Sequence, residues 1–470
     1  MPSFTYLTGV TAATETLATG ETGYIGVGAT LNGSILGTAN DNYVQVNGAI
    51  VTTSTTVSLA LTSQDSTVVV GTTGTITNLS ASGIGVEVDV AGGASVVSSR
   101  IFNAGEVFGR QIGIFAHTVD LDDRLTIQNT GSILGQDTGI LIHGGGSEVI
   151  INTGTINGFL RGISNLSEAY FTSGPDVTVM NTGTIQGSLV SIQTGAQDDS
   201  ITNRGLLLGN VEMGAGLDLL DNRGGRVEGD VHLGDSNDRY VGTGGGSLSG
   251  AVYGDAGSDT FFGNENAADV FVGGADVDTL DFRLGGQVTL ALDLSFAQSG
   301  AALGDTYFEM ENVFGSDIGN DVIRGNGATN ALFGFAGADS LDGAGGADVL
   351  RGGTGIDTLT GGTGDDTFRF SALNECGDLI TDFAGNLGNN DRFQITAAAF
   401  GGGLVAGALA ANQFQTRADN IALDADDRFI FNTTDRTLWF DADGSGAGAA
   451  IMVADLQAGA VVTAADILLI

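Results

Sequence analysis

The sequence predicts an all-β protein, a right-handed parallel β-solenoid that begins as a β-helix, continues as a β-roll and ends in a β-rich cap. A nine-residue unit repeats between 315 and 370, and a longer unit with the core N-x-G-x-aliphatic-x-G precedes it. The chain has 78 Gly but only two Pro among 470 residues, which suits turns between short repeated strands. Such repeats cannot bury an apolar face singly, so they stack to form a core.

The nine-residue unit has an acidic or amide residue at one position and an apolar residue two positions later. Its clearest copies are GGTGIDTLT (352–360) and GGTGDDTFR (361–369). Six Gly-rich residues predict a turn, because Gly adopts backbone angles that other residues avoid. The remaining three predict a strand whose middle side chain enters the core. The apolar positions are Ile323, Leu332, Leu341, Leu350, Leu359 and Phe368.

The polar position of the repeat predicts a metal site. Two units make one rung, so residues 18 apart fall on the same edge of the roll. A carboxylate from one turn and carbonyls from its neighbours offer the hard oxygen ligands that Ca²⁺ prefers, at about 2.3–2.6 Å. We therefore expect several Ca²⁺ ions. The candidate ligands form two columns, with Asp321, Asp339 and Asp357 on one edge and Asn330, Asp348 and Asp366 on the other.

The repeat resembles the calcium-binding nonapeptide of RTX (repeats-in-toxin) proteins. The tail resembles the closing domain of RTX proteins exported by type I secretion, in GLVAGALAANQF (403–414), DADDRFIF (424–431) and LWFDADGSGAGAA (438–450). The resemblance covers roughly 190–470. It implies an uncleaved C-terminal export signal and a secreted, extracellular location at the cell surface.

The longer repeat predicts a second kind of column. Its Asn residues are expected to stack amide to amide inside a turn, with a structural role: Asn103, Asn129, Asn152, Asn181, Asn203 and Asn222. Acidic residues just ahead of these strands are expected to share the register of the nonapeptide Asp: Asp123, Glu148, Asp199, Asp218, Asp238 and Asp259. The metal-ligand candidates outside the nonapeptides are Asp218, Asp238, Asp259 and Asp278.

These patterns divide the chain into four parts. We expect a strand-rich cap or docking segment over 1–70, a β-helix over 71–250, the calcium roll over 251–370 and the C-terminal cap with the export signal over 371–470. An insertion at about 282–312 is predicted to bulge out as a hairpin or cap. In the tail, DADGSG offers Asp441 and Asp443 as ligands for one more Ca²⁺, and a plain acidic turn is the alternative.

Charge and cysteine content exclude several classes of function. There are 55 acidic and 16 basic residues, none of them Lys, giving a net charge of −39 that repels nucleic acid and anionic membranes. Cys376 is the single cysteine, so no internal disulfide forms and a partly buried free thiol is expected. We see no cleavable signal peptide at the N-terminus and no apolar run of about 18 residues that predicts a transmembrane segment.

Catalytic motifs are missing from the sequence. Neither H-E-x-x-H nor G-x-S-x-G occurs, which argues against a metalloprotease and a lipase. His117 and His143 each follow a ladder Asn by 14 residues, so they are expected to stack as exposed imidazoles, with a transition-metal pair as the alternative. No spacing supports a polysaccharide-cleaving cluster, whose candidate members are Asp122, Arg124, Arg161 and Tyr170.

The sequence therefore predicts a non-enzymatic structural protein, a surface-layer, filament or matrix component that folds and self-assembles on extracellular Ca²⁺. Its expected partner is a second copy of itself. Two alternatives stay open: an adhesin that binds surface polysaccharide, and a lyase or epimerase acting on polysaccharide along the β-helix. Electron microscopy with calcium distinguishes sheets or filaments from single rods.

Overall fold

The computed structural model describes residues 4–38, 40–53, 55–62, 65–90, 98–118, 123–144, 146–165, 177–263, 268–386 and 389–470. They fall into two compact units, Met1–Asp259 with Asp269–Asp276, and Thr260–Ala268 with Val277–Ile470. Strands dominate both units, and short turns of helix such as α1 (Ala397–Phe400) are rare. In the described part of the chain, no helix is both long and apolar enough to cross a membrane.

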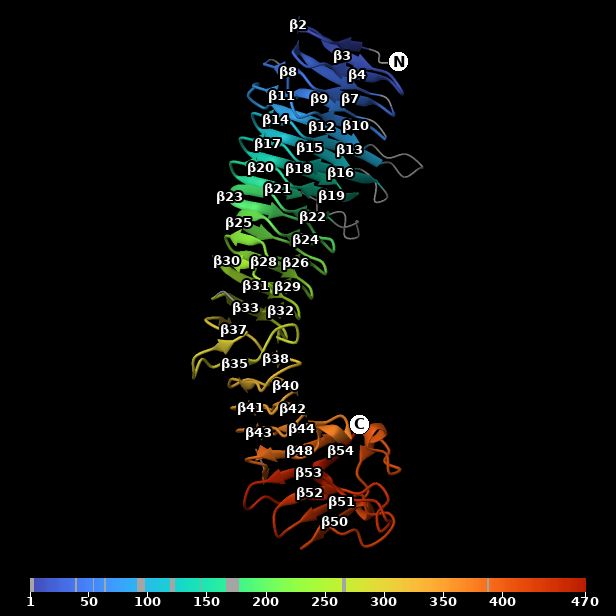
Figure 1. Ribbon diagram of the computed structural model, residues 1–470, viewed down its shortest axis with the longest axis vertical. Helices are drawn as coiled ribbons and strands as arrows, with labels where there is room; N and C mark the ends of the chain where they lie inside the picture. Colours follow the sequence, from blue (N-terminus) through green and yellow to red (C-terminus); the bar gives the residue numbers. More distant parts are fainter. Residues whose placement is uncertain are drawn as a thin grey trace. The chain divides into compact units, whose positions relative to one another are not determined.

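The first unit is a parallel β-solenoid, as predicted. The chain runs in repeated circuits, here called rungs, of up to three short strands (Figure 1). Each strand pairs in parallel with the corresponding strand of the next rung. The first strands of the rungs are β1 (Phe4–Tyr6), β4 (Thr22–Ile25), β7 (Tyr43–Val46), β10 (Thr67–Val70), β13 (Ser98–Asn103), β16 (Arg124–Asn129), β19 (Ser147–Asn152), β22 (Val177–Asn181), β24 (Ser200–Asn203), β26 (Leu219–Asp221) and β29 (Arg239–Val241).

The second and third strands of each rung continue the same stacking. Second strands are β2 (Gly9–Thr11), β5 (Ala29–Asn32), β8 (Ala49–Thr52), β11 (Thr75–Asn78), β14 (Glu106–Gly109), β17 (Ser132–Gly135), β20 (Thr155–Gly158), β27 (Arg226–Glu228) and β30 (Ser247–Leu248). Third strands are β3 (Thr14–Leu17), β6 (Ser34–Gly37), β9 (Val57–Leu61), β12 (Ile84–Val90), β15 (Ile112–Thr118), β18 (Thr138–Gly144), β21 (Arg161–Asn165), β28 (Val231–Asp235), β31 (Ala251–Ala256) and β33 (Val270–Ala275). In two rungs one longer strand spans both places, β23 (Thr184–Gln193) and β25 (Leu206–Glu212).

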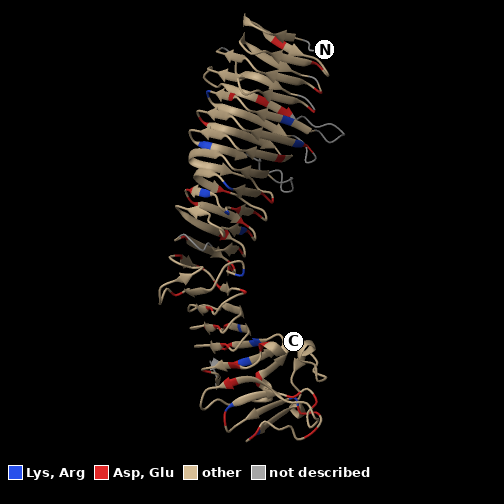
Figure 2. Cartoon of the chain, viewed as in Figure 1, with Lys and Arg blue, Asp and Glu red and all other residues tan. Residues whose placement is uncertain are grey.

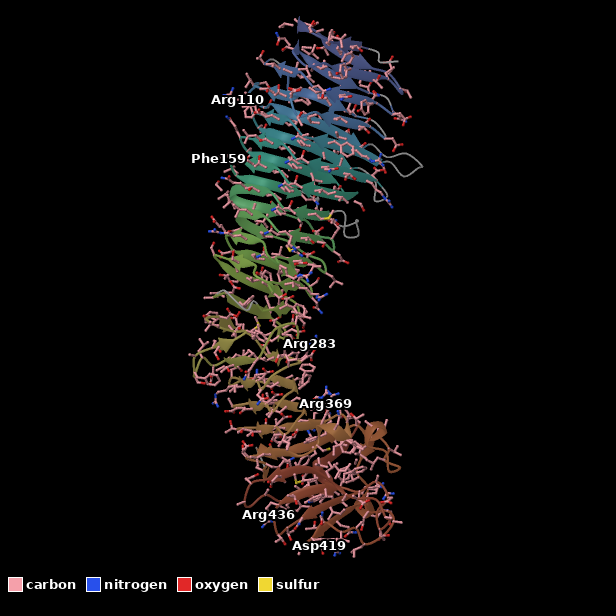
Figure 3. All side chains as sticks on the ribbon, viewed as in Figure 1. Arg110, Phe159, Arg283, Arg369, Asp419 and Arg436 are labelled. Atoms are coloured by element: carbon pink, nitrogen blue, oxygen red, sulfur yellow. The ribbon has the colours of Figure 1, made fainter. Side chains whose placement is uncertain are left out.

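Side chains in these strands alternate between core and surface, because successive residues of a strand point to opposite faces. In the first strands, Ile101, Ile127 and Ile150 stack at the same register position and are fully buried. Side chains of the turns between second and third strands, such as Arg110 and Phe159, project outward (Figure 3). The apolar material of the sequence thus forms one column per inward-facing strand position.

The predicted N-terminal cap or docking segment over 1–70 is not separate from the solenoid. Strand β4 pairs in parallel with β1 and β7, and β10 pairs with β7 and β13. Thr-rich strands without charge look different in sequence from the later rungs, yet they alternate inward Val44 and Val46 with outward Gln45 in the same way. The first unit also takes in 251–259 and 269–276, which the sequence assigns to the roll.

The second unit contains the predicted β-roll. Strands β39 (Val322–Arg324), β41 (Ser340–Asp342) and β43 (Thr358–Thr360) pair in parallel with an offset of 18 residues, from Val322 to Ser340 to Thr358. All six predicted apolar positions are at most 1% exposed. The opposite strands are β34 (Thr279–Asp281), β38 (Asn312–Phe314), β40 (Ala331–Ala336), β42 (Val349–Thr354) and β44 (Thr367–Phe370).

The predicted insertion at 282–312 is only partly a hairpin. Strand β35 (Val288–Ala291) pairs antiparallel with β36 (Ser299–Gly300), which is the expected hairpin. However, β35 also pairs in parallel with β39, so its apolar residues Val288 and Leu290 are buried as part of the roll. The alternating VTLALDL pattern therefore belongs to a strand of the roll. Only the segment after this strand, which leads into β36, forms the predicted bulge.

The C-terminal cap extends both edges of the roll. Strand β45 (Asp378–Ile380) pairs with β43 and with β53 (Ile451–Leu456), and β48 (Arg392–Ile395) pairs with β44 and with β54 (Ile467–Leu469). On the edge formed by β45 and β53, the sheet continues as an antiparallel meander of β53, β52 (Thr437–Phe440) and β51 (Phe429–Asn432). Buried Phe side chains fill the cap, among them Phe429, Phe431 and Phe440.

Candidate metal centre

The two predicted columns of acidic residues exist in the roll. On one edge, the backbone N–H of Asp321 donates to Asp339 Oδ1 at 2.8 Å, and that of Asp339 donates to Asp357 Oδ1 at 2.7 Å. On the other, the N–H of Asn330 donates to Asp348 Oδ1 at 2.7 Å, and that of Asp348 donates to Asp366 Oδ1 at 2.9 Å. Each carboxylate thus uses one oxygen to accept a hydrogen bond from the preceding turn, which links the two turns.

The second oxygen of these carboxylates is buried without a partner. The side chains of Asp339, Asp348, Asp357 and Asp366 are at most 2% exposed. Among the described residues, no hydrogen-bond donor reaches their Oδ2 atoms. Burial raises the pKa of Asp339 and Asp348 to about 7 and also raises that of Asp357 and Asp366. A row of buried anions is costly unless a cation offsets it.

Glycines keep space open around these oxygens. A Cβ on Gly334 would overlap Asp339 Oδ2 and would lie 2.6 Å from the carbonyl oxygen of Gly352 in the next rung. Gly343 stands in the same relation to Asp348 Oδ2 and, at 2.5 Å, to the carbonyl oxygen of Gly361. A carboxylate oxygen of one turn and a carbonyl oxygen of the next therefore face the same small space, which any side chain would fill.

This arrangement fits Ca²⁺. The facing atoms are hard oxygens from carboxylates and carbonyls, the ligands that Ca²⁺ takes. No three His, Cys, Asp or Glu side chains converge on one point among the described residues, so most further ligands would be backbone carbonyls of the glycine turns. Asp339, Asp348, Asp357 and Asp366 would each supply an oxygen, and the bound ion would supply the positive charge that the column lacks.

The comparison with protein-family models agrees with this chemistry. The family model of the RTX calcium-binding nonapeptide repeat (four copies) matches residues 316–350 and 342–372. Residues 316–372 are an RTX calcium-binding repeat region. A solved structure with similarity is AlgE6R3, a subunit of mannuronan C5-epimerase from Azotobacter vinelandii, at 27% identity over 32% of this chain and 78% of that one, with a TM-score of 0.23. No curated protein matches the chain.

The upper end of the RTX roll differs from its middle. Asp321 accepts hydrogen bonds at both oxygens, from the N–H of Val288 at 2.8 Å and of Ser316 at 2.7 Å. Asn330 accepts from the N–H of Asn326 at 2.8 Å and donates to the Glu311 carbonyl at 2.9 Å. Both predicted ligands therefore lie in their columns, but the protein itself satisfies them, which makes the four Asp residues below them the stronger ligands.

The columns continue past the last nonapeptide, which sequence reasoning missed. Asp357 N–H donates to Asp378 Oδ1 at 3.0 Å, and Asp366 N–H donates to Asp391 Oδ1 at 3.1 Å. Burial raises the pKa of Asp378 to about 8 and of Asp391 to about 7. The signal was present, because Asp378 precedes buried Ile380 by two residues, as in the repeat.

A third column of carboxylates lies in the first unit. The N–H of Asp199 donates to Asp218 Oδ1, that of Asp218 to Asp238 Oδ1 and that of Asp238 to Asp259 Oδ1, each at 2.7 Å. Burial raises the pKa of Asp218 to about 8, of Asp238 to about 7 and of Asp259 to about 6. Among the described residues, Oδ2 of Asp218 and of Asp238 is buried without a hydrogen-bond partner. These turns lie outside the matched repeats, and their role as calcium ligands stays a prediction.

The predicted register fails at the start of this column. Leu125 pairs with Glu148, so Asp123 lies two residues ahead of the column. Glu148 does occupy it, buried at 1% exposure, and accepts a hydrogen bond from Thr118 Oγ1 at 2.7 Å. The next position is Val177. Apolar Leu125 and Val177 therefore take the carboxylate position in the rungs of β16 and β22, on either side of Glu148.

In the second unit, Asp278 N–H donates to Glu311 Oε2 at 2.8 Å.

The predicted asparagine ladder is present over its whole length. Each Nδ2 donates to the Oδ1 of the next Asn at 2.8 Å, from Asn103 through Asn129, Asn152, Asn181 and Asn203 to Asn222. All six side chains are at most 1% exposed. The ladder needs no ion, because every amide offers both a donor and an acceptor. Its role is structural.

Two other candidates, the histidine pair and the acidic turn of the tail, lie outside the columns. The rings of His117 and His143 stack at 5.3 Å between centroids, as predicted, and His117 Nδ1 lies 3.2 Å from Asp89 Oδ1. Asp441 accepts from the N–H of Asp443 at 3.1 Å, and Asp443 accepts from the N–H of Gly448 at 3.0 Å. These bonds describe an acidic turn after β52, and a calcium role there stays a prediction.

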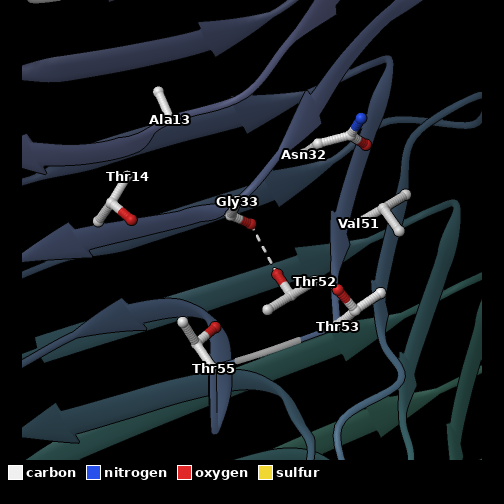
Figure 4. Close-up of a pocket in the computed structure, with 8 residues that line it drawn as sticks. All are labelled: Ala13, Thr14, Asn32, Gly33, Val51, Thr52, Thr53 and Thr55. Carbon is white, nitrogen blue, oxygen red and sulfur yellow. Dashed lines mark hydrogen bonds between the residues drawn. The ribbon is translucent and has the colours of Figure 1, made fainter.

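Of three remaining candidates, one can be placed and two cannot. Cys376 is a half-buried free thiol, and burial raises its pKa to about 12. Asp122 and Tyr170 lie outside the described residues. A groove of the first unit, about 540 Å³, is lined in its described part by four Thr with Ala13, Asn32, Gly33 and Val51 (Figure 4). Thr52 Oγ1 donates to the Gly33 carbonyl at 2.6 Å, and these eight residues include no acid or base.

Proposed function

We propose that the protein is a secreted calcium-binding structural protein of the bacterial cell surface, a surface-layer, filament or matrix component that folds and self-assembles on extracellular Ca²⁺. The observation that carries the proposal is the row of buried Oδ2 atoms in the RTX roll, at Asp339, Asp348, Asp357 and Asp366. Without a cation these carboxylates repel one another along each edge. With Ca²⁺ they become the ligands that close successive turns.

Calcium concentration would then decide where the roll folds. Extracellular calcium modules bind at about 10⁻⁴–10⁻³ M, far above cytosolic free calcium. The chain would stay open at its RTX region inside the cell and close outside it. An open chain suits export through a one-step channel, and the C-terminal region 371–470 is the proposed export signal. Deleting 371–470 should therefore retain the protein inside the cell.

A structural role is favoured over an enzymatic one by what the fold contains. The first unit consists of stacked rungs and the second of the roll and its cap, and the described lining of the groove of about 540 Å³ carries no general acid or base. Six of the buried polar side chains outside the carboxylate columns, Asn103, Asn129, Asn152, Asn181, Asn203 and Asn222, serve the asparagine ladder. The stacked strand surfaces of the first unit suit association between copies.

The test compares the full chain in millimolar Ca²⁺ and in chelator, by sedimentation velocity and negative-stain electron microscopy. We expect sheets or filaments in Ca²⁺ that dissolve in chelator. A chain that folds with Ca²⁺ yet stays monomeric at high concentration contradicts self-assembly and leaves calcium binding intact. Incubation with acidic polysaccharides then separates an enzyme from an adhesin, by release of products or by retention without turnover.

A further inference from the structure

The first strands of the first unit form a surface unlike the rest of the molecule. Nine of them, from β1 to β24, contain one acidic residue, Glu148, and it is buried at 1% exposure. Their outward residues include two charged side chains, Arg100 and Arg124, both basic. Figure 2 shows these strands almost entirely in the colour of uncharged residues. In a chain of net charge −39, so long a stretch of strand surface without an exposed carboxylate is notable.

Apolar and aromatic side chains line this surface in register. Outward Val69 pairs with Phe102, and outward Ile151 pairs with Met180, which is 39% exposed. Further up, Tyr24 and Tyr43 border a shallow groove of about 330 Å³, and a second groove of about 310 Å³ runs beside Val69 and Phe102. We call the outward face of β1, β4, β7, β10, β13, β16, β19, β22 and β24 the first-strand face.

We propose that the first-strand face packs against the same face of a second copy of this chain. This inference rests on the proposed self-assembly and adds the surface through which copies meet. The charge distribution selects the partner, because two copies at −39 repel wherever carboxylates oppose each other and can approach closely only where they are absent. Around Val69, Ile151 and Met180, which donate no hydrogen bonds, an apolar partner surface gains more than a polysaccharide rich in hydroxyl groups, although Gln45 and Gln128 also point outward on this face.

The size of the face sets the strength of the contact. Strands about 4.8 Å apart and about four residues long at about 3.3 Å per residue give a plane of roughly 38 Å by 13 Å, or about 500 Å². Stable interfaces bury about 800 Å² on each partner. A single pair would therefore be weak, and the contact would become effective when it repeats in an assembly. Two flat sheets pack face to face at about 10 Å, the spacing of a β-sandwich.

The test introduces one carboxylate into the face and measures assembly of the full chain in millimolar Ca²⁺. Ile151→Asp and Met180→Asp should each raise the protein concentration needed for assembly at least tenfold. The matched control is Leu134→Asp, an outward, half-buried position of β17 on the neighbouring face, which should leave that concentration unchanged. Circular dichroism confirms that each variant folds. Added NaCl should strengthen wild-type assembly, because it screens the repulsion between carboxylates that are more than about 8 Å apart at physiological ionic strength.

The outcomes are separable. If wild type assembles and the two face variants, correctly folded, assemble equally well, the first-strand face is not the interface. If all three variants weaken assembly alike, the effect is general charge repulsion and the inference is also wrong. If wild type itself stays monomeric with Ca²⁺, the proposed function fails before the face is tested. Weaker assembly in added NaCl would point to bridging through ions instead of contact through the first-strand face.

Discussion

The asparagine ladder of the first unit and the aspartate columns of the RTX roll solve the same packing problem with opposite consequences. Both place one polar side chain per rung inside a turn. Asn152 donates to Asn181 Oδ1 and accepts from Asn129 Nδ2, each at 2.8 Å. It thereby satisfies one hydrogen-bonding group of each neighbour. Asp348 accepts from the N–H of Asn330, and its other oxygen is left over. An amide has a donor and an acceptor, whereas a carboxylate has acceptors alone.

The difference teaches where the molecule depends on its surroundings. A ladder of amides is complete when the chain closes on itself, so its rungs need only the chain. A column of carboxylates is complete only with a cation, so we expect the folding of its rungs to depend on the calcium concentration. Fixing Gly-rich turns is also entropically costly, and glycine loses more conformational freedom on folding than any other residue. We therefore expect the ion to contribute in two ways, by offsetting the charge of the buried carboxylates and by compensating the entropy lost in ordering the glycine turns.

Removing calcium should have the largest effect. In chelator we expect the RTX roll over 316–391 to unfold, while the asparagine-ladder rungs over 98–203 keep their structure. Far-ultraviolet circular dichroism should lose part of the β signal, and the melting transition that is left should be that of the asparagine-ladder rungs. Limited proteolysis should cut within 316–391 and spare 98–203. An unchanged spectrum and melting curve in chelator would contradict calcium-dependent folding.

Acid should partly replace calcium. The pKa of Asp339 and of Asp348 rises from 3.8 to about 7 in the folded, ion-free roll because of burial. The folded state then holds protons that the unfolded chain has lost, so this stabilisation is full below about pH 4 and disappears as pH rises through about 7. Protein in chelator should gain roll structure between pH 7 and pH 5 by circular dichroism.

Calcium-loaded protein should respond in the opposite direction, because protons compete with Ca²⁺ for the same oxygens. The calcium concentration at the binding midpoint should rise as pH falls from 7 to 5, where protons keep the ion-free roll folded and calcium has to displace them. A midpoint independent of pH over this range would show that the buried carboxylates are not the ligands. Melting of the asparagine-ladder rungs serves as the internal control, since those amides do not titrate.

Replacing one amide of the ladder should weaken the first unit alone. Asn152→Ala leaves the donor of Asn129 and the acceptor of Asn181 without their partner, so we expect a loss of about 2–4 kcal/mol in the free energy of unfolding. The matched control is Asn157→Ala at an outward, half-buried position of β20, with a loss within about 0.5 kcal/mol. The calcium midpoint of the roll should be the same in both variants.

The sequence predicted a feature of the ladder or of the columns when that feature repeats at a fixed position of the motif. The ladder from Asn103 to Asn222 and the two columns of the roll were predictable because one residue type recurs at a fixed place in a repeat, and stacking then fixes the neighbours. The His117–His143 stack followed from the same register. These features need only the period of the pattern.

The errors arose where register depends on the neighbouring rungs. Asp123 resembles a column residue locally, but the pairing of β16 with β19 places Leu125 there. Asp378 and Asp391 lie beyond the glycine turns, so only the spacing to an apolar residue two positions later marks them, and strand pairing with β43 and β44 brings them into the columns. The rungs over 4–70 were missed because Thr-rich strands lack the polar marker of either repeat, although their inward residues alternate normally.

Adding a methyl group in the open space of the roll should weaken calcium binding specifically. Gly352→Ala places a Cβ against Asp357 Oδ2, whereas Gly327→Ala meets no atom within 4 Å. We expect the calcium midpoint of Gly352→Ala to rise about tenfold, which corresponds to about 1.4 kcal/mol. The midpoint of Gly327→Ala should stay close to that of wild type. Calcium titrations followed by circular dichroism compare the two. Equal shifts in both variants would indicate a general backbone effect of losing a glycine.

The smallest expected effect changes sign with calcium. Asp348→Asn gives the column an amide, as Asn330 already does one rung earlier, where it finds both an N–H donor and a carbonyl acceptor. In chelator the variant should be more stable than wild type by about 1 kcal/mol, because it removes a buried anion and supplies a donor.

In calcium the same substitution removes an oxygen charge from the ligand set, so the roll should need about threefold to tenfold more Ca²⁺ to fold. Chemical unfolding in chelator and calcium titration measure the two sides separately. Asp348→Ala is the matched control, since it removes the charge without adding a donor and should weaken calcium binding while giving less stabilisation in chelator. A variant less stable than wild type in both conditions would mean that Asp348 acts only through its bond to Asn330. The contrast between the amide ladder and the carboxylate column would then be one of strength instead of kind.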